Sequence, residues 1–236
     1  MTRLLVFSAH AADFVWRAGG ALALAAQQGG EALVLSLSYG ERGESGELWK
    51  EKGQTEANVK RIRQEQAEAA CEALGCAFES LDLGDYPLEV GRPEMDRILE
   101  VVRRFRPTTI MTHTAEDPYN PDHPVTHHAA VRARQLAAGA GVASAFERIA
   151  PPVLSLFEPH QPELCGFVPN VFLNITSVWS HKLAAMEATR AQRYLVPYYT
   201  DLAGRRANHA RRISGDSLVQ QAEAFQRVTP VVAQSI

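Results

Sequence analysis

Two short stretches of the sequence combine imidazole and carboxylate groups at spacings that suit a metal ion. His10 and Asp13 lie three residues apart, directly after the apolar run Leu4–Ser8. His123 lies in a second stretch, residues 117–123, that also carries two aspartates and two prolines. Zinc accepts both imidazole nitrogen and carboxylate oxygen, and it commonly has three protein ligands in catalytic sites. Because His-x-x-Asp alone also occurs as an ordinary polar pair on a loop, the prediction depends on the second stretch.

Both stretches are expected at the carboxyl ends of buried strands. The run Leu4–Ser8 is apolar almost throughout, as in parallel strands covered on both faces. Residues 108–112 form a similar run ahead of the second stretch. Pro124 is well placed to open the helix that follows, which puts His123 at a helix N-terminus. Since ligands bind at the carboxyl ends of strands in open α/β sheets, His10, Asp13 and His123 are candidates for one metal site.

Candidates for proton transfer and anion binding lie on other loops. The glycine-rich loop 38–47 carries Arg42 and Glu44. It is consistent either with a solvated charged loop or with a site in which Arg42 binds a substrate carboxylate and Glu44 transfers protons. His160 lies between two prolines, after the predicted strand 153–157. We interpret Asp82, Asp85 and Tyr86 as surface loop residues, and His127 and His128 as packing or surface histidines.

The rest of the pattern predicts an α/β fold with a mostly parallel sheet. Strands and helices alternate from the N-terminus, beginning with a β-α-β unit. We expect strands at 4–8, 32–37, 77–83, 108–112, 153–157 and 171–175, and helices at 15–28, 55–74, 93–105, 125–138 and 178–194. Residues 1–236 are expected to form a single domain, with 176–236 as its helical C-terminal extension.

Composition excludes several classes of function. A hydrophobic content of 46% and a charged content of 22% are ordinary for a soluble globular domain. The net charge of −3 gives no reason to expect a nucleic-acid partner. The sequence shows neither an apolar run of membrane-spanning length nor a signal-peptide pattern. Cys71, Cys76 and Cys165 are expected to be reduced thiols, so we predict a cytoplasmic protein without a membrane partner.

His10-x-x-Asp13 together with Pro121-Asp122-His123 resembles the motifs of the PIG-L/LmbE family. Members of this family are zinc-dependent deacetylases of N-acetylated sugars and related compounds, built on a Rossmann-like sheet. The resemblance covers roughly residues 3–175. It implies that His10, Asp13 and His123 are the ligands of a Zn²⁺ ion.

The sequence also departs from the family motifs. The first family motif is Ala-His-Pro-Asp-Asp-Glu, and its first aspartate serves as the general base. Ala12 stands at that position here, Ala11 replaces the proline, and Phe14 replaces the terminal glutamate. Asn120 replaces the first histidine of the second motif, His-Pro-Asp-His, which supports the oxyanion. The resemblance therefore preserves the metal ligands but not the groups that hydrolyse an amide.

One branch of the family shares these departures. Long strings of this sequence resemble it, including residues 8–20, 40–45, 117–120 and 157–163. The branch belongs to bacterial gallate degradation, and the resemblance implies zinc-dependent addition of water to a carbon–carbon double bond of a small-molecule tricarboxylate. We take Glu44 and His160 as the catalytic acid and base, in an order that stays open. Arg17, Arg42 and Asn120 are the candidates for substrate binding.

Two other functions remain as alternatives. One is a PIG-L-type N-deacetylase of a small molecule that uses Glu44 or Asp122 as its base. The other is a protein that binds a metal and a ligand without catalysis. Ala12 argues against the first, and the presence of Glu44 and His160 beside an intact metal triad argues against the second. We also expect the chain to form a homo-oligomer.

Overall fold

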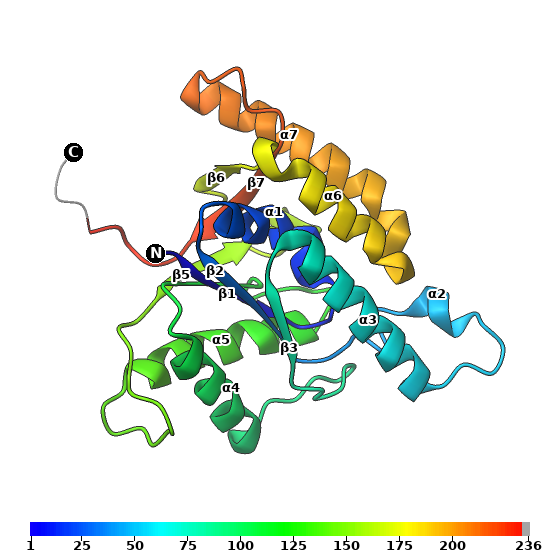
Figure 1. The fold of residues 1–236 in the computed structure, drawn as a ribbon, viewed down its shortest axis with the longest axis vertical. Helices are drawn as coiled ribbons and strands as arrows, with labels where there is room; N and C mark the ends of the chain where they lie inside the picture. Colours follow the sequence, from blue (N-terminus) through cyan, green and yellow to red (C-terminus); the bar gives the residue numbers. More distant parts are fainter. Residues whose placement is uncertain (233–236) are drawn as a thin grey trace.

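The centre of the fold is one seven-stranded sheet, seen in a computed structural model that describes residues 1–232 (Figure 1). The strand order is β3-β2-β1-β4-β5-β7-β6. The five strands from β3 to β5 are parallel, whereas β7 is antiparallel to both β5 and β6. The strands are β1 Arg3–Ser8, β2 Glu31–Ser36, β3 Ala77–Ser80, β4 Thr109–Thr112, β5 Val153–Phe157, β6 Val171–Asn174 and β7 Ala222–Arg227.

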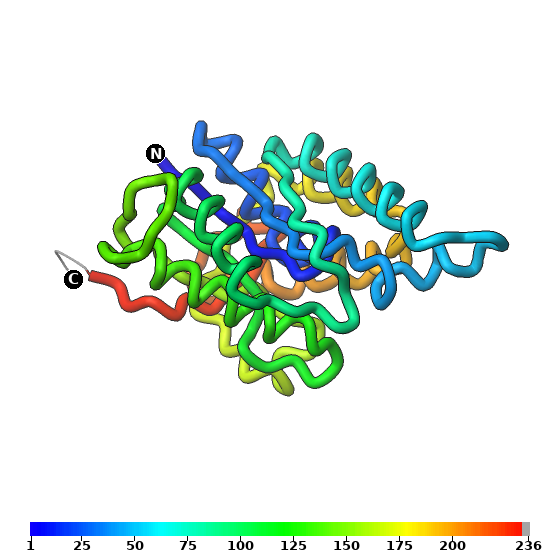
Figure 2. The backbone as a smooth tube through the Cα atoms, turned by 90° about the horizontal axis from the view of Figure 1, so that it is seen from below, coloured from blue at the N-terminus to red at the C-terminus, as the bar shows by residue number. Residues whose placement is uncertain are grey.

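Helices cover both faces of the sheet, as the parallel strands require. In Figure 1, α4 and α5 lie on one side, and α1, α3, α6 and α7 lie on the other. The short helix α2 and its loops project from the body of the chain (Figures 1 and 2). The helices are α1 Asp13–Gln27, α2 Gly46–Trp49, α3 Glu56–Leu74, α4 Arg92–Phe105, α5 Asp122–Ala138, α6 Trp179–Ala188 and α7 Val196–Ser214, with 3-10 turns η1 Pro162–Leu164, η2 Thr176–Val178 and η3 Arg190–Leu195.

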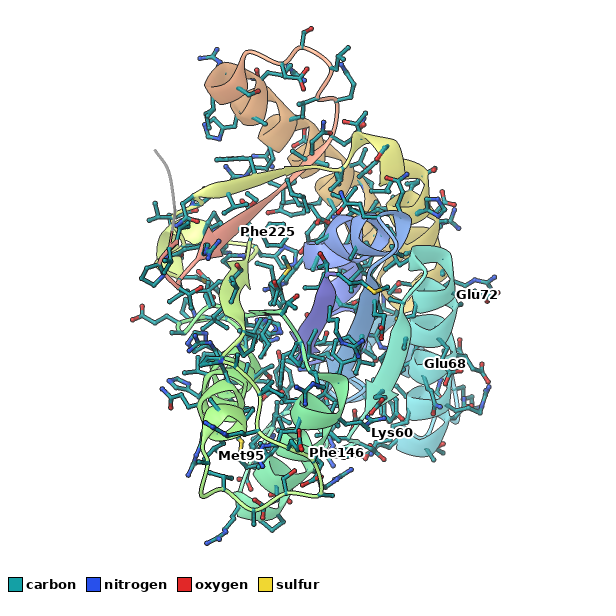
Figure 3. The ribbon with its side chains drawn as sticks, turned by 60° about the vertical axis from the view of Figure 1, so that its left-hand side comes forward. Lys60, Glu68, Glu72, Met95, Phe146 and Phe225 are labelled. Atoms are coloured by element: carbon teal, nitrogen blue, oxygen red, sulfur yellow. The ribbon has the colours of Figure 1, made fainter. Side chains whose placement is uncertain are left out.

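Side chains of β1, an inner strand of the sheet, point alternately to its two faces and contribute to two separate cores. Leu4 and Val6 of β1 pack with the helices α1, α3 and α6, while Leu5 and Phe7 pack with α4 and α5. Phe225 of β7 is buried in the first of these clusters. Polar residues such as Glu68 and Glu72 lie instead on the outer side of α3 (Figure 3). The uninterrupted apolar sequence of β1 is therefore explained by burial on both faces.

Several local sequence signals have the expected structural effect. The Thr55 hydroxyl caps α3 by accepting the Asn58 N–H at 3.2 Å, and Gly75 ends the helix with φ of 70°. Gly20 lies in the middle of α1 because nothing larger fits there: a Cβ atom would lie 2.6 Å from Ile175 Cγ2 and 3.0 Å from Glu223 Cδ. Glycine at this position therefore allows α1 to pack closely against the residues around it.

The C-terminal part differs from the sequence prediction. The sequence predicts a helical extension over 176–236 that becomes irregular, but residues Ala222–Arg227 form β7 inside the sheet. The helix expected at 178–194 is interrupted at Thr189, so that α6 is followed by η3. Residues 233–236 of the expected irregular tail lie outside the described residues. All three cysteines are free, and no helix within residues 1–232 is both long and apolar enough to cross a membrane.

Candidate active site

The turn between β1 and α1 brings His10 and Asp13 together. Asp13 is the first residue of α1, where a carboxylate is favoured by the free N–H groups and the helix dipole. Its Oδ2 accepts a hydrogen bond from the His10 backbone N–H at 2.8 Å. The same oxygen lies 3.3 Å from His10 Nδ1. The His-x-x-Asp spacing thus folds into a tight turn that directs both side chains to one point.

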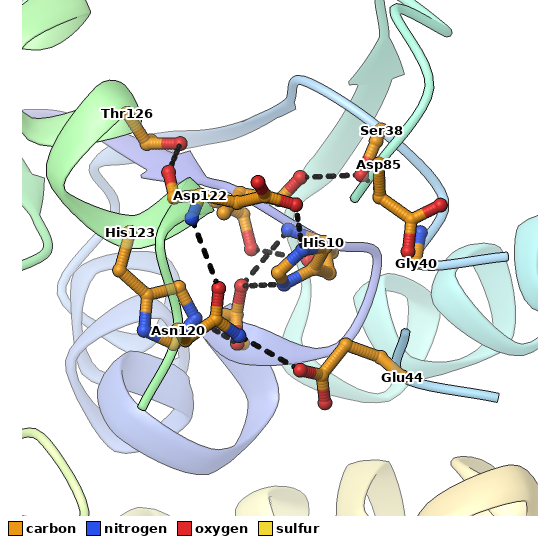
Figure 4. Close-up of polar contacts among 12 residues, drawn as sticks. His10, Ser38, Gly40, Glu44, Asp85, Asn120, Asp122, His123 and Thr126 are labelled. Atoms are coloured by element: carbon orange, nitrogen blue, oxygen red, sulfur yellow. Dashed lines mark hydrogen bonds and ion pairs between the residues drawn. The ribbon is translucent and has the colours of Figure 1, made fainter. Parts of the chain in front are cut away.

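His123 reaches this point from the first turn of α5. Its Nε2 lies 3.6 Å from Asp13 Oδ1. One potential ligand atom from each of His10, Asp13 and His123 lies within 4.8 Å of the other two, and all three residues are buried. The structure therefore brings together the three residues that the sequence predicts as metal ligands. Figure 4 shows two of them, His10 and His123, near one another.

The remaining nitrogen of each histidine faces a carboxylate. His10 Nε2 lies 3.2 Å from Asp122 Oδ2, and His123 Nδ1 lies 2.7 Å from Asp117 Oδ2. A carboxylate at such a position accepts the ring N–H and fixes the tautomer that leaves the other nitrogen free to bind a metal. His10 Nδ1 and His123 Nε2 are those free nitrogens, and neither has a hydrogen-bond partner among residues 1–232. Two unpaired imidazole nitrogens beside one carboxylate fit a zinc-type cation.

The charges around His10 also favour a bound cation. Burial opposes a positive charge on this ring, but the Asp13 carboxylate and the hydrogen bond with Asp122 raise its pKa to about 10. The pocket of acidic groups therefore stabilises a cation at this place, and a divalent metal supplies one without protonating the ring. The Asp122 carboxylate also accepts hydrogen bonds from the backbone N–H groups of Tyr86 and Leu88, so its oxygens already have partners in the protein.

A second acidic group near His10 is structural. The atoms of His10, Asp85 and Asp122 also lie within 4.8 Å of one another. The Asp85 carboxylate, however, accepts the backbone N–H groups of Arg42 and Gly43, at 2.9 and 2.7 Å. Asp85 is fully buried, so its expected place on the surface is wrong. It holds the loop that carries Glu44.

His113 is a site residue that the sequence analysis did not assign. It follows β4, is fully buried and stacks on His123 with ring centroids 4.0 Å apart. Its Nε2 accepts the Ala9 N–H at 3.1 Å and lies 3.4 Å from Asp13 Oδ2. Burial and the neighbouring His123 hold its pKa well below the usual value, so the ring is neutral. In the sequence, the position of His113 directly after a predicted strand was the one signal that could have marked it as a site residue.

A cavity of about 180 Å³ opens beside the metal ligands. It is lined by Asp13, Trp16, Arg17, Glu44, Tyr86, Asp117, Tyr119, Asn120, His123, His160, Gln161, Gln192, Tyr194 and Leu195. Four of the five residues proposed from the sequence for catalysis and substrate binding therefore face this cavity. Tyr86, expected on the surface, is partly exposed and also contributes to the wall.

The polar residues of the cavity differ in charge and in how they are held. The Glu44 carboxylate accepts a hydrogen bond from Asn120 at 2.8 Å (Figure 4). It also accepts one from Gln192 at 2.9 Å. Arg17 is only 6% exposed, yet it forms no ion pair with a carboxylate of the described chain. His160 is exposed at the rim. The surrounding protein and the Arg17 charge lower the pKa of His160 to about 4, so the free imidazole is neutral at pH 7.

Arg42 does not take part in this cavity. Its side chain is about half exposed, and its Nε lies 3.3 Å from Glu56 Oε2 on α3. The backbone of Arg42 is fixed by Asp85, which directs the side chain away from the lining residues. The structure therefore does not place Arg42 where it was expected to bind substrate. Among the residues that line the cavity, Arg17 is the arginine.

Comparison with known proteins identifies the family to which the chain belongs. The profile of the GlcNAc-PI de-N-acetylase (PIG-L) family matches residues 5–134. The chain belongs to the PIG-L family. A curated relative from Pseudomonas putida KT2440, a 4-oxalmesaconate hydratase, is 45% identical over 98% of this chain and 91% of the relative. A probable N-acetyl-α-D-glucosaminyl L-malate deacetylase from Bacillus cereus is 27% identical over 80% of this chain and 83% of that protein.

A solved PIG-L structure has the same architecture throughout. The 4-carboxy-2-hydroxymuconate hydratase from Pseudomonas putida KT2440 superimposes with a TM-score of 0.96 at 44% identity, covering all of both chains. The Rossmann-like α/β fold predicted from the sequence is thus confirmed. PIG-L proteins are metal-dependent, and the His10, Asp13 and His123 cluster is where this chain could hold a metal.

Within the PIG-L fold, position 12 has no group that could take a proton. Ala12 is 1% exposed and immediately precedes α1, beside the candidate metal ligand Asp13. Asn120, which replaces a family histidine, donates its amide to Glu44 and has no titratable proton. Any proton transfer in this cavity must therefore use other side chains, of which Glu44 and His160 are the ones that the sequence suggested.

Several cavity residues could not be found from the sequence. Gln192, Tyr194 and Leu195 come from η3, which the sequence assigns to the end of a long helix. Tyr199 of α7 contacts His160, with its hydroxyl 3.4 Å from Nε2. No motif marks these positions, because only the packing of η3 and α7 over α1 brings them to the site.

Proposed function

We propose that this protein is a metal-dependent hydratase. It adds water to a carbon–carbon double bond of 4-oxalomesaconate and forms 4-carboxy-4-hydroxy-2-oxoadipate. The observation that carries the proposal is that Glu44, His160 and Arg17 line one cavity with Asp13 and His123 of the metal triad, while position 12 is alanine. The 45% identity to a protein named 4-oxalmesaconate hydratase supports the same substrate.

The proposed metal is zinc, held by His10, Asp13 and His123. Two neutral imidazoles and one carboxylate form a donor set typical of catalytic zinc. When bound, zinc would act as a Lewis acid toward an oxo or carboxylate oxygen of the substrate. Asp117 and Asp122 would orient the two histidines through the ring nitrogens that do not face the metal position.

The protein's own side chains would bind the substrate and move its protons. Arg17 is a buried cation without a carboxylate partner among the described residues, and it would bind a substrate carboxylate through its planar fork of N–H groups. Hydration joins the oxygen of water to one alkene carbon and a proton to the other. Glu44 and His160 would carry out the two proton transfers, one from water and one to carbon.

A PIG-L-type N-deacetylase is the second candidate, favoured by the family match and by the relative from Bacillus cereus. Two features weigh against it. Ala12 removes the usual base, and Asp122, the substitute considered from the sequence, already accepts two backbone N–H groups beside His10. Glu44 would then be the base left for water near the metal.

A direct assay separates the two functions. The zinc-loaded protein is given 4-oxalomesaconate, followed by its absorbance, and separately an N-acetylglucosamine derivative, followed by amine release. We expect hydration and negligible deacetylation. Asp13→Ala should lose metal and hydratase activity together, whereas Asp201→Ala, at an exposed position of α7, should lose neither. Efficient amine release without hydration would refute the proposal.

Assembly into a homo-oligomer and a cytoplasmic location remain predictions. Light scattering of the purified protein and localisation of a tagged chain would test them.

A further inference from the structure

The Glu44 carboxylate is held between two amide side chains that come from different segments of the cavity wall. Asn120 Nδ2, from the loop before α5, donates to Oε1 at 2.8 Å. Gln192 Nε2, from η3, donates to Oε2 at 2.9 Å. The Tyr86 hydroxyl also lies 3.3 Å from Oε1, but Gln192 is the only side chain of residues 1–232 that donates to Oε2.

The direction of both amides is fixed by groups that can only donate a hydrogen bond. The Trp16 indole N–H donates to Gln192 Oε1 at 3.1 Å, so the NH₂ group of Gln192 must face Glu44. The Asp122 backbone N–H donates to Asn120 Oδ1 at 3.1 Å, which turns the Asn120 NH₂ group to Glu44 in the same way. Neither amide can flip without setting two donors against each other.

Burial makes this arrangement costly to break. Trp16, Asn120 and Gln192 are 2%, 6% and 5% exposed, so an amide group that loses its partner has little water to replace it. Gln192 lies in a non-helical conformation within η3, with φ of −129°, which breaks the helical path at this point. The adjacent Ala191 N–H donates to Gln66 Oε1 at 3.2 Å and ties η3 to α3.

We propose that Gln192, oriented by Trp16, is a positioning residue that acts through Glu44 and makes Glu44 the base of the reaction. Because each Glu44 oxygen accepts an amide N–H, the two amides fix the position and orientation of the carboxylate beside the cavity. Glu44 then accepts a proton from water as the water oxygen bonds to the alkene carbon. The other alkene carbon receives its proton by way of His160, and solvent exchange returns both groups to their starting states. This inference rests on the proposed hydratase function.

Two substitutions test the two hydrogen bonds of the chain that runs from Trp16 through Gln192 to Glu44. Gln192→Met keeps the length of the side chain and removes the donor to Glu44. Trp16→Phe keeps Gln192 but removes the N–H that orients it. We expect kcat to fall about tenfold or more in Gln192→Met and by less in Trp16→Phe, with KM changed by less than about threefold and metal content unchanged. Trp179→Phe, on α6 outside the cavity, is the matched control and should retain wild-type kcat.

A double-mutant cycle distinguishes positioning from a general structural effect. In a Glu44→Gln background, Gln192→Met should cause no further loss of kcat, because its partner is already absent. The proposal is overturned if Gln192→Met keeps wild-type kcat, or if its loss is the same in both backgrounds.

An infrared measurement makes the inference independent of the assigned reaction. The Glu44 carboxylate band, identified in the wild-type minus Glu44→Gln difference spectrum, should shift in frequency in Gln192→Met because Oε2 loses its hydrogen bond. An unshifted band in that variant would overturn the positioning role even in an active hydratase. If the band shifts but the wild type deacetylates, the proposed function is refuted and the coupling of Gln192 to Glu44 stands.

Discussion

Two arginines that look equivalent in the sequence have opposite surroundings in the structure. Arg17 is buried in the cavity wall, whereas Arg42 is half exposed and pairs with Glu56. Arg17→Gln should raise KM for the tricarboxylate by about 10- to 100-fold, because a charged hydrogen bond contributes about 1.5–3 kcal/mol. Arg42→Gln is the matched control, and steady-state kinetics should show its KM within about twofold of the wild type. Equal losses in both variants would mean that Arg42, not only Arg17, binds substrate.

The same Arg17 variant has a second readout in His160. The surrounding protein and the Arg17 cation disfavour the imidazolium form, which lowers the pKa of His160 to about 4. Removing the cation should therefore raise this pKa toward 6.5, and a bound polycarboxylate should raise it in the wild type for the same electrostatic reason. NMR titration of the His160 ring would measure both changes. A pKa that falls in Arg17→Gln would contradict this account of the site.

At the scale of elements, a buried ion pair between α6 and β7 also holds α1 in place. Lys182 of α6 lies 2.6 Å from Glu223 of β7, and the Glu223 carboxylate also accepts the N–H groups of Gly20 and Ala21. Both charged side chains are at least 95% buried. The N-terminal helix that carries Asp13 and Arg17 is thus held by residues more than 150 positions later in the chain.

Glu223→Gln should destabilise the fold because it leaves Lys182 as an unpaired buried charge. The expected cost is about 3–5 kcal/mol, which corresponds to a fall in Tm of roughly 6–20 °C for a domain of this size. The double variant Lys182→Met with Glu223→Gln should recover part of the loss. Glu47→Gln removes an exposed pair with Lys50 and should change Tm little. Calorimetry would check all three, and a double variant with simply additive losses would rule out the pairing argument.

The sequence predicts the elements that carry their own signals and misses those set by distant contacts. Thr55, Gly75 and the apolar run before His10 act within a few residues of themselves, so the corresponding helix and strand were readable. β7 was missed because its sequence, with Glu223 and Gln226, is partly polar, and its pairing partners β5 and β6 lie at least 48 positions earlier.

The candidate site likewise contains residues that sequence patterns reveal and residues that only the folded structure places there. His10, Asp13, His123 and Glu44 follow strands or begin helices at the carboxyl edge of the sheet, which a sequence pattern can reveal. Arg42 shows the limit of that reasoning, because the buried Asp85 fixes its backbone and directs it outward. Gln192 carries no signal of its own. Its place over Glu44 depends on how η3 packs, which is a property of the whole fold.

On the scale of the whole molecule, the metal ligands come from both layers of helices. Asp13 begins α1 on one face of the sheet, and His123 lies at the start of α5 on the other (Figure 1). A metal held by both ligands would tie the two layers together at the carboxyl edge. Because the unfolded chain does not preform this site, metal binding should stabilise the folded state.

Removal of the metal should therefore lower Tm as well as activity. With free metal at about 100 times its dissociation constant, binding adds about 2.7 kcal/mol, or roughly 5–11 °C in Tm for a chain of this length. Differential scanning calorimetry of the chelator-treated and zinc-loaded protein measures this difference. It should vanish in Asp13→Ala and shrink in Asp117→Asn, which keeps all three ligands but weakens the group that orients His123. Asp201→Ala should keep the full difference. If Asp13→Ala retained it, the stabilising metal would lie elsewhere in the molecule, and the triad would not be its site.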